Sequence, residues 1–347
     1  MTAETIRIAT FAAPLSRDGP GLLLRDYLKG EDPQIAATIA VIVRAAPDIL
    51  VLTDHDYDLT GAAATALGDL LAGAGQTYPY FFALAPNSGM ATGLDLDRNG
   101  RLGEARDAMG YGKFAGDGGL LILSKLPLDM ANARDFSTLL WRDLPGAILP
   151  QIDGRAFPST EVQAILRLSS VAHWAIPVLP PDGAPFTLMV SSSSPPVFDG
   201  PEDMNGLRNR DELRLWSLYL DGTFGPPPVS FVFAGNTNLD PVDGDGLRDT
   251  MAAFLADPRL QDPMPTSVGG TAASDADQRG DPALDTADWP DGKPGNLRVS
   301  YVLPSIDWQV TGAGVFWPAP GDPDAALLGS DGLAAGPHRL TWVDVTR

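Results

Sequence analysis

Short apolar runs separated by turn residues predict that strands and helices alternate in the first half of the chain. Several runs of four to seven residues are rich in Ile, Leu and Val, as expected for buried strands. After Asp32-Pro33, apolar residues recur about once per helical turn, which predicts a helix with an N-cap and a first-turn proline. The elements predicted here are strands at 6–11, 47–53 and 120–123 and helices at 33–45 and 62–72.

Strands dominate the second half of the predicted pattern. They fall near 162–169, 172–179, 186–190, 229–234, 297–303, 308–316 and 339–345, and helices are predicted at 203–220 and near 247–256. Hairpins mixed with helices favour two sheets packed face to face with helices outside. Because no linker is evident, we expect residues 1–347 to form a single domain, with a long loop insertion around 85–160.

Charge narrows the range of partners. The 24 basic and 44 acidic residues give a net charge of −20, which opposes attraction to nucleic acid and to anionic lipid. A small phosphorylated or otherwise anionic ligand remains compatible, because a bound divalent cation reverses the local field. No apolar run approaches the roughly 18–20 residues that cross a bilayer. The composition favours an acidic protein from a salty or extracytoplasmic setting.

The chain has no cysteine, which excludes disulfides, thiolate nucleophiles and cysteine-ligated zinc but leaves the compartment open. The first ten residues lack a charged segment followed by an apolar one, as a signal peptide would have. If an export signal once preceded them, the protein would be periplasmic or secreted.

Polar residues at the ends of predicted strands provide the strongest clue to function. In chain order, the informative segments are Arg7-Ile-Ala-Thr-Phe, Pro47-Asp-Ile-Leu-Val-Leu, Gly119-Leu-Leu-Ile-Leu-Ser-Lys, Pro195-Pro-Val-Phe-Asp-Gly-Pro-Glu-Asp, Gly235-Asn-Thr-Asn, Arg298-Val-Ser-Tyr-Val-Leu-Pro-Ser and Pro337-His-Arg-Leu. Their order and spacing resemble the endonuclease/exonuclease/phosphatase superfamily of metal-dependent phosphoesterases, and look closest to a bacterial subgroup. The resemblance implies a DNase I-like, four-layer α/β sandwich of two packed mixed sheets flanked by helices.

The resemblance also implies a set of reactive residues. In that family, an asparagine and a glutamate end the first two strands, and a histidine ends a later one. A Gly-Asp-x-Asn segment supplies the water-activating aspartate, and an Asp-Tyr-Val segment and a final Asp-His pair complete the site. Carboxylates suit Mg²⁺, which prefers oxygen ligands, and histidines stabilise the charge that grows on phosphate oxygens.

This chain departs from the family pattern at most of these positions. Asn238 and His338 match, whereas six others differ: Ala12, Asp54 (a shortened substitute for glutamate), Ser192, Asn236, Ser300 and Pro337. Asn236 is neutral and cannot act as a base. Losing such linked groups should lower the rate on the order of 10³-fold or more.

Two function hypotheses follow from these departures. The first is a non-catalytic or strongly impaired member that binds an anionic or polar ligand through Asn236, Asn238 and His338, or that presents a partner surface. The alternative is a metal-dependent phosphoric ester hydrolase with an altered site, in which Asp54 and neighbouring acids hold the divalent cation. An ordinary Mg²⁺ site is not expected.

A second candidate metal site lies between residues 95 and 107. Asp95, Asp97 and Asn99 alternate ahead of Gly100, as in the first half of a calcium loop. Arg101 would offer its carbonyl oxygen, and Asp107 or Glu104 would close the shell, because the twelfth position is Arg106. We expect Ca²⁺ in a structural role, and an acidic turn is the simpler alternative.

Other polar clusters have ordinary explanations. Asp54, Asp56 and Asp58 would either retain a weak cation or lie solvated in a loop, and the acids of 240–246 favour a turn ahead of a helix over a metal site. Zinc binding by the three histidines, His55, His173 and His338, is conceivable, but His173 lies in a predicted strand beside Trp174 and suits packing better. A Ser192–His338 pair lacks the Gly-x-Ser-x-Gly elbow of acyl-transfer enzymes.

Overall fold

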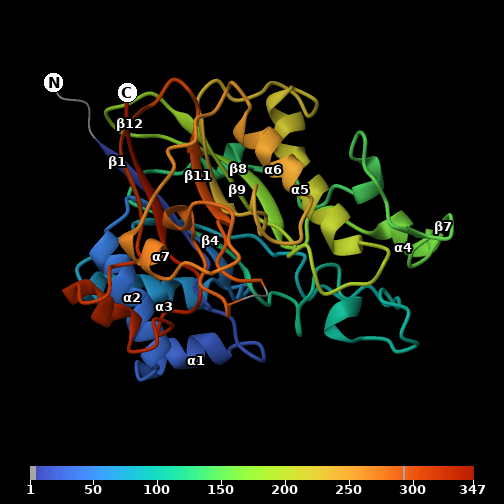
Figure 1. The fold of residues 1–347 in the computed structure, drawn as a ribbon, viewed down its shortest axis with the longest axis horizontal. Coiled ribbons are helices and arrows are strands. Elements are labelled where there is room, and N and C mark those ends of the chain that lie inside the picture. Colours follow the sequence, from blue (N-terminus) through green and yellow to red (C-terminus); the bar gives the residue numbers. More distant parts are fainter. Residues whose placement is uncertain (1–4, 292–293) are drawn as a thin grey trace.

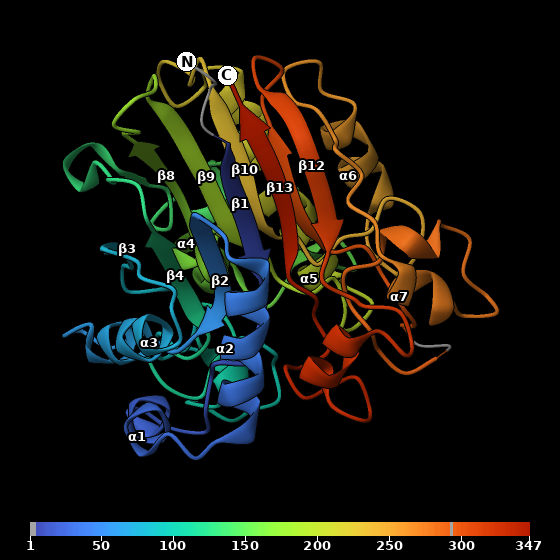
Figure 2. The same ribbon diagram turned by 90° about the vertical axis from the view of Figure 1, so that its left-hand side faces the viewer.

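Two β-sheets pack face to face and carry helices on their outer faces (Figures 1 and 2). The computed structural model of the chain describes residues 5–291 and 294–347. This arrangement is the predicted four-layer sandwich. Within the described ranges, no helix combines the length and apolar character needed to cross a membrane.

The first sheet has six strands in the order β12-β13-β1-β2-β4-β3. It is mixed, because β1 runs parallel to β2 and antiparallel to β13. The strands are β1 (Ile6–Phe11), β2 (Ile49–His55), β3 (Tyr80–Phe82), β4 (Gly119–Ser124), β12 (Gln309–Val315) and β13 (Thr341–Thr346).

The second sheet has five strands in the order β11-β10-β9-β8-β5 and is also mixed, with β9 parallel to β10. Its strands are β5 (Arg134–Asp135), β8 (Ala172–Val178), β9 (Phe186–Ser192), β10 (Phe231–Asn236) and β11 (Ser300–Pro304). A separate hairpin pairs β6 (Gln151–Ile152) with β7 (Arg155–Ala156).

Three large apolar clusters hold the layers together. The central cluster lies between the sheets and includes Ile8 and Val51 from one sheet and Val190 and Val232 from the other. A second cluster joins the outer face of the first sheet to α1, α2 and α3, and a third joins the second sheet to α4, α5 and α6. The helices are α1 (Leu22–Lys29), α2 (Pro33–Ala45), α3 (Ala62–Gly73), α4 (Thr160–Ile165), α5 (Met204–Leu220), α6 (Arg248–Leu255) and α7 (Val268–Ala272).

Period-two alternation decides which strand residues reach the central core. In β2, Ile49 and Val51 face the other sheet, whereas Leu50 and Leu52 pack under the helices. Continuing this alternation to the strand ends places polar residues at the rim of the gap between the sheets. That rim is where the sequence predicted the functional site.

The helix predicted at 33–45 forms with those bounds, because its start is fixed by side-chain chemistry. The Asp32 carboxylate accepts hydrogen bonds from the backbone N–H groups of Gln34 and Ile35 at 2.8 and 3.1 Å. Pro33 occupies the first turn, where no N–H is needed.

The strand predicted near 162–169 is wrong, because helix α4 occupies Thr160–Ile165. Ser159 starts this helix by accepting a hydrogen bond from the Val162 N–H at 3.1 Å. Leu166 and Leu168 are buried, but they lie outside any strand. Their apolar spacing therefore reflects packing against the second sheet and not strand alternation.

The region from 85 to 160 contains β4 and otherwise only short elements. These are η1 (Ala105–Asp107), η2 (Met130–Asn132), β5, η3 (Trp141–Asp143), β6 and β7. Two further 3₁₀ turns, η4 (Pro282–Leu284) and η5 (Pro323–Leu328), lie in the last quarter of the chain.

Candidate functional site

Three polar residues form one row across the end of the second sheet. Asn236 on β10 pairs in register with Ser192 on β9 and with Ser300 on β11. The residues two positions further into these strands, Val190, Ala234 and Val302, belong to the core between the sheets. The polar row therefore faces the first sheet at the rim of the sandwich, and all three of its side chains are neutral.

The matching rim of the first sheet lies at the same end of the molecule. Ala12 follows β1, Asp54 lies near the end of β2, and Pro337 and His338 precede β13, which is antiparallel to β1. The geometry thus brings together the strand ends that the family resemblance singled out.

A segment that the sequence did not single out, 285–288, joins the two rims. Ala287 forms β-bridges both to Leu297, just before β11, and to His338. The Thr286 hydroxyl accepts hydrogen bonds from the N–H groups of Val299 and Ser300 at 2.8 and 2.9 Å. This segment has no periodic pattern, so nothing in the sequence marked it.

Asn236 and Asn238 bond mainly to each other and to the neighbouring backbone. The Asn236 side-chain oxygen accepts from the Asn238 N–H at 3.1 Å, and its amide donates to the Asn238 side-chain oxygen at 3.2 Å. Asn238, which adopts a left-handed backbone with φ 50°, donates to the Ser193 carbonyl at 2.7 Å. These contacts shape the turn after β10, so both amides already serve a structural purpose.

His338 is held as a neutral imidazole. Burial, followed by the nearby Arg339 charge, lowers the pKa of His338 to about 4. Its ring meets Trp289 edge-to-face, with 5.1 Å between the ring centroids. Its Nδ1 is buried without a hydrogen-bond partner in the part of the chain that the structure describes. A neutral ring cannot attract phosphate by charge.

Asp54, half-buried near the end of β2, and Asp56, buried just after that strand, form an acidic pair. Burial raises the pKa of Asp54 to about 6 and that of Asp56 to about 7. Asp56 accepts hydrogen bonds from the backbone N–H groups of Arg17 and Gly118 at 3.0 and 3.1 Å. Asp58, in contrast, accepts four hydrogen bonds from Thr60, Ala62 and Ala63 at the start of α3.

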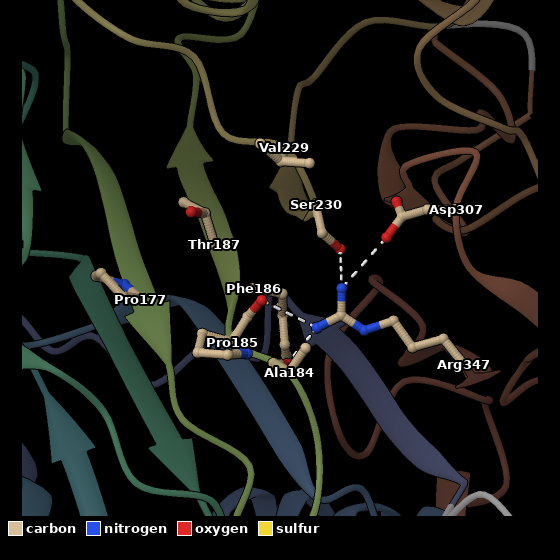
Figure 3. A pocket seen from close by; sticks show the side chains of 9 residues that line it. All are labelled: Pro177, Ala184, Pro185, Phe186, Thr187, Val229, Ser230, Asp307 and Arg347. Atoms are coloured by element: carbon tan, nitrogen blue, oxygen red, sulfur yellow. Dashed lines mark hydrogen bonds and ion pairs between the residues drawn. The ribbon is translucent and has the colours of Figure 1, made fainter.

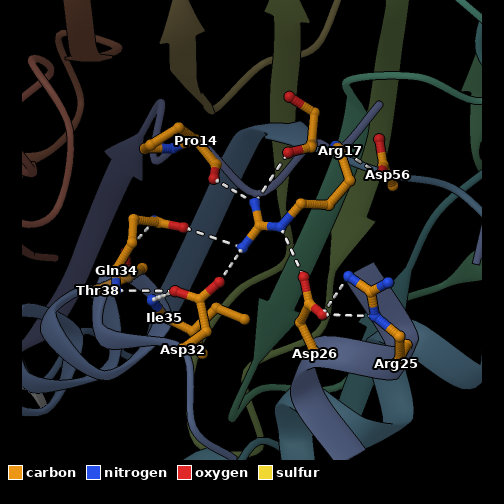
Figure 4. A network of polar contacts seen from close by, with 10 residues as sticks. Pro14, Arg17, Arg25, Asp26, Asp32, Gln34, Ile35, Thr38 and Asp56 are labelled. Carbon is orange, nitrogen blue, oxygen red and sulfur yellow. Dashed lines mark hydrogen bonds and ion pairs between the residues drawn. The ribbon is translucent and has the colours of Figure 1, made fainter. Parts of the chain in front are cut away.

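The arginine nearest this pair is occupied by structural contacts (Figure 4). The Arg17 guanidinium donates to the carboxylates of Asp26 and Asp32, both at 3.0 Å, and to the side-chain oxygen of Gln34 at 3.2 Å. It also donates to the carbonyls of Pro14 and Ser16. Arg17 thus pins the loop after β1 onto α1 and α2, and its donors are not free to hold a phosphate.

Two further arginines near the rim are similarly engaged. Arg298 donates to both oxygens of Asp262 and stacks over Tyr301. Arg339, which is fully buried, donates to Asp288 and to two carbonyls and lies over Trp317.

The predicted calcium loop brings three carboxylates together. Oxygens of Asp95, Asp97 and Asp107 lie within 4.8 Å of one another, so this triad could hold a metal ion. Asn99 lies in the same turn, but its side-chain oxygen accepts the Arg101 N–H at 2.8 Å. The Arg101 guanidinium is a cation that pairs with Glu104 at 3.4 Å and has no acceptor atom, so this residue could contribute only through its carbonyl.

The predicted packing role of His173 is confirmed. Its ring is fully buried and makes hydrogen-bond contacts with the Ser169 hydroxyl at 2.7 Å and with the Glu212 carbonyl at 3.0 Å. Among the described residues, the Asp95 triad is the single group of three or more histidines and acids at metal-binding distance, so the three histidines do not form a zinc site.

The acids of 240–246 form the predicted turn. One Asp240 oxygen accepts the N–H groups of Val242 and Asp243 at 2.7 and 2.8 Å, shortly before α6.

A shallow hollow of about 300 Å³ lies away from this rim (Figure 3). It is formed where β9 and β10 begin, at the opposite end of both strands from the polar row. Arg347 lies across it and donates to Ser230, to Asp307 and to the carbonyls of Ala184 and Pro185. Arg347, just after β13 of the first sheet, therefore bonds to segments that flank strands of the second sheet.

Solved structures with this fold include several named phosphoesterases. The chain is similar to an endonuclease/exonuclease/phosphatase from Beutenbergia cavernae, with 18% identity and a TM-score of 0.58, covering 99% of this chain and 71% of that one. It is also similar to sphingomyelinase C from Streptomyces griseocarneus, with 15% identity and a TM-score of 0.50 over 98% of this chain and 99% of the other. A mannosyl-6-phosphatase from Bacteroides thetaiotaomicron is 10% identical, with a TM-score of 0.50 over 99% and 100% of the two chains. At these identities, the likeness establishes the fold alone.

No curated protein sequence matches the chain. The model of the Endonuclease/Exonuclease/phosphatase family, however, matches residues 19–331, which is most of the chain. The chain therefore belongs to the endonuclease/exonuclease/phosphatase family.

Proposed function

We propose that this chain is a non-catalytic or strongly impaired member of its family that keeps a polar cleft as a binding site. The observation that carries the proposal is the register row of Ser192, Asn236 and Ser300. The family resemblance requires one histidine and two aspartates at these positions. Neutral side chains here leave no group to deprotonate water and no fixed charge to balance a phosphate.

The surroundings of the row support the same conclusion. Ala12 offers no metal ligand, and the amides of Asn236 and Asn238 are committed to the turn after β10. His338 is neutral at physiological pH because of its lowered pKa. Each of the two amide nitrogens gives one of its two N–H groups to the turn. We propose that a small polar or anionic ligand binds at the rim through the second N–H of Asn236 and of Asn238 and through the His338 ring.

The alternative is a metal-dependent phosphoesterase with an altered centre. Its support is the Asp54–Asp56 pair. A divalent cation between the two carboxylates would favour their charged forms and offset the cost of removing them from water. Two structural neighbours are named as a sphingomyelinase and a sugar phosphatase, so a phosphodiester and a phosphomonoester are the substrate classes to test.

Turnover and metal binding separate the two proposals. The purified chain is assayed on p-nitrophenyl phosphate and bis-p-nitrophenyl phosphate with Mg²⁺, Mn²⁺ or Ca²⁺, beside Asn238→Ala and Asp54→Asn. We expect rates at the level of buffer for all three proteins. A metal-dependent rate well above buffer that both substitutions abolish would establish the alternative instead.

We also propose that the 95–107 loop binds Ca²⁺ in a structural role. The proximity of the Asp95, Asp97 and Asp107 carboxylates supports it, because Ca²⁺ prefers several hard oxygen ligands. Saturating Ca²⁺ should raise the Tm, and Asp95→Asn combined with Asp97→Asn should reduce that rise, as binding to the folded state alone is stabilising. A rise as large in the double variant as in the parent chain would contradict the assignment.

A further inference from the structure

A second group of oxygen ligands lies in the segment between α7 and β11. Asp275 and Asn296, which are 21 residues apart, are joined by a 2.6 Å hydrogen bond from the Asn296 N–H to the Asp275 carboxylate. Gln278 closes a turn onto Asp275 through its backbone N–H at 3.3 Å. The Gln278 side-chain amide then donates to Asp285 at 2.5 Å. These contacts place four oxygen-bearing side chains around one turn.

Three of these side chains carry a buried oxygen that no described residue satisfies. They are Oδ1 of Asp275, Oε1 of Gln278 and Oδ1 of Asn296, and no donor among the described residues bonds to them. Asn296 is only 3% exposed, and its amide nitrogen is already held by the Ala273 carbonyl at 2.7 Å. Its oxygen is therefore fixed as an acceptor inside the turn. An unsatisfied buried acceptor is costly, and three together are unusual.

Negative charge gathers at the same place. Asp285 is 2% exposed, and burial raises its pKa to about 7, with Asp240, Asp243 and Asp275 adding repulsion. The arginines of this region form ion pairs or hydrogen bonds with other residues. Arg279 pairs with Asp243 and Arg298 with Asp262, while Arg248 donates to the Val242 carbonyl. Among the residues that the structure describes, no cationic side chain forms an ion pair with Asp285.

We propose that Asp275, Gln278, Asp285 and Asn296 form a second divalent-cation site, with Ca²⁺ as the natural occupant. All the available ligands are hard oxygens, two from carboxylates and two from amides, a mixture that suits the flexible shell of Ca²⁺ better than the strict octahedron of Mg²⁺. A cation here satisfies the three free acceptors and the charge of Asp285 at once. It also ties the turn at Asp275 to Asn296, shortly before β11 and the polar row.

The test isolates this site from the 95–107 loop. Ca²⁺ binding is measured by isothermal titration and by Tm on the full chain carrying Asp95→Asn and Asp97→Asn. On that background, Asp275→Asn and Asp285→Asn are compared with the control Asp277→Asn, which removes one charge from an exposed position in the same turn. We expect Ca²⁺ binding to persist in the background and in the control, and to weaken by about tenfold or more in the two ligand variants.

A fourth variant keeps the test informative if the ligand variants fold poorly. Gln278→Glu adds a carboxylate to the turn, so the metal-free form should have a lower Tm and a larger rise on adding Ca²⁺ than the background protein. Absence of Ca²⁺ binding in the background, or equal affinity in the Asp285→Asn and Asp277→Asn proteins, would overturn the proposal. A smaller Ca²⁺-induced rise for Gln278→Glu would do the same.

Discussion

Side chains near the rim of the sandwich are largely occupied by contacts within the protein. Arg17 is bound to two carboxylates and two carbonyls, and Asn238 to a neighbouring strand end. A reactive centre would need such groups to point freely at a substrate. At the scale of single residues, these side chains therefore serve the fold, and Asp54, Asp56 and His338 are rim residues whose pKa values are clearly shifted.

The raised pKa of Asp56 has a defined consequence for stability. Its folded-state pKa of about 7, against an ordinary value of 3.8, means that the folded state binds the proton more tightly than the unfolded state. Stability contributed at this position is therefore lost as pH rises from about 4 to about 7. Asp56→Asn cannot ionise, so the parent chain should lose stability relative to the variant across this range.

Urea unfolding of both proteins at several pH values between 4 and 7 measures this difference. The variant also alters one of the two hydrogen bonds that Asp56 accepts. This change shifts the variant's free energy of unfolding by the same amount at every pH, so the difference in pH dependence between the two proteins is unaffected. Parallel pH profiles for the two proteins would show that Asp56 titrates normally in the folded state.

Single elements show how closely the strands and helices are fitted. A methyl group on Gly235 in β10 would lie 2.2 Å from the Ser191 carbonyl oxygen on β9, whereas one on Gly68 within α3 would have no neighbour within 4 Å. Gly235→Ala should thus destabilise the protein by about 1–3 kcal/mol through overpacking. Gly68→Ala should be neutral or stabilising by up to about 1 kcal/mol, since alanine favours the helix.

The pair is compared by denaturant unfolding, with Gly68→Ala as the matched control for the added methyl. Equal free energies of unfolding for the two variants would mean that the backbones of β9 and β10 move apart enough to hold the added methyl group without loss of stability.

The sequence predicts elements well where local chemistry sets their bounds. The helix at 33–45 follows from Asp32 and Pro33, and the buried strands follow from their apolar runs. Helix α1 was not predicted, because it starts at Gly21 with no capping side chain. Helix α4 was mistaken for a strand because its six residues are too few to show a helical period.

At the scale of the whole molecule, the sequence predicted the rim residues and missed the oxygen cluster that we propose as a second cation site. The rim residues were recognised because a family pattern ties each of them to a strand end, and the register of Ser192, Asn236 and Ser300 brings them together. The oxygen cluster of Asp275, Gln278 and Asn296 arises from a long turn that folds back on itself. No periodicity links these positions, so only the structure could bring them together.

The two packed mixed sheets flanked by helices are those of the endonuclease/exonuclease/phosphatase family, whereas the row of Ser192, Asn236 and Ser300 at the rim is neutral. We propose that this neutral row prevents phosphoester hydrolysis.

The most direct test is the metal-dependent hydrolysis rate of the unaltered chain on a phosphomonoester and a phosphodiester. It is measured beside a variant that restores the family's charged residues at the row, Asn236→Asp with Ser192→His and Ser300→Asp. We predict that the unaltered chain stays at the buffer rate with Mg²⁺, Mn²⁺ and Ca²⁺, and that any gain in rate appears in the restored variant. A substantial rate in the unaltered chain that disappears on Asn238→Ala would contradict it.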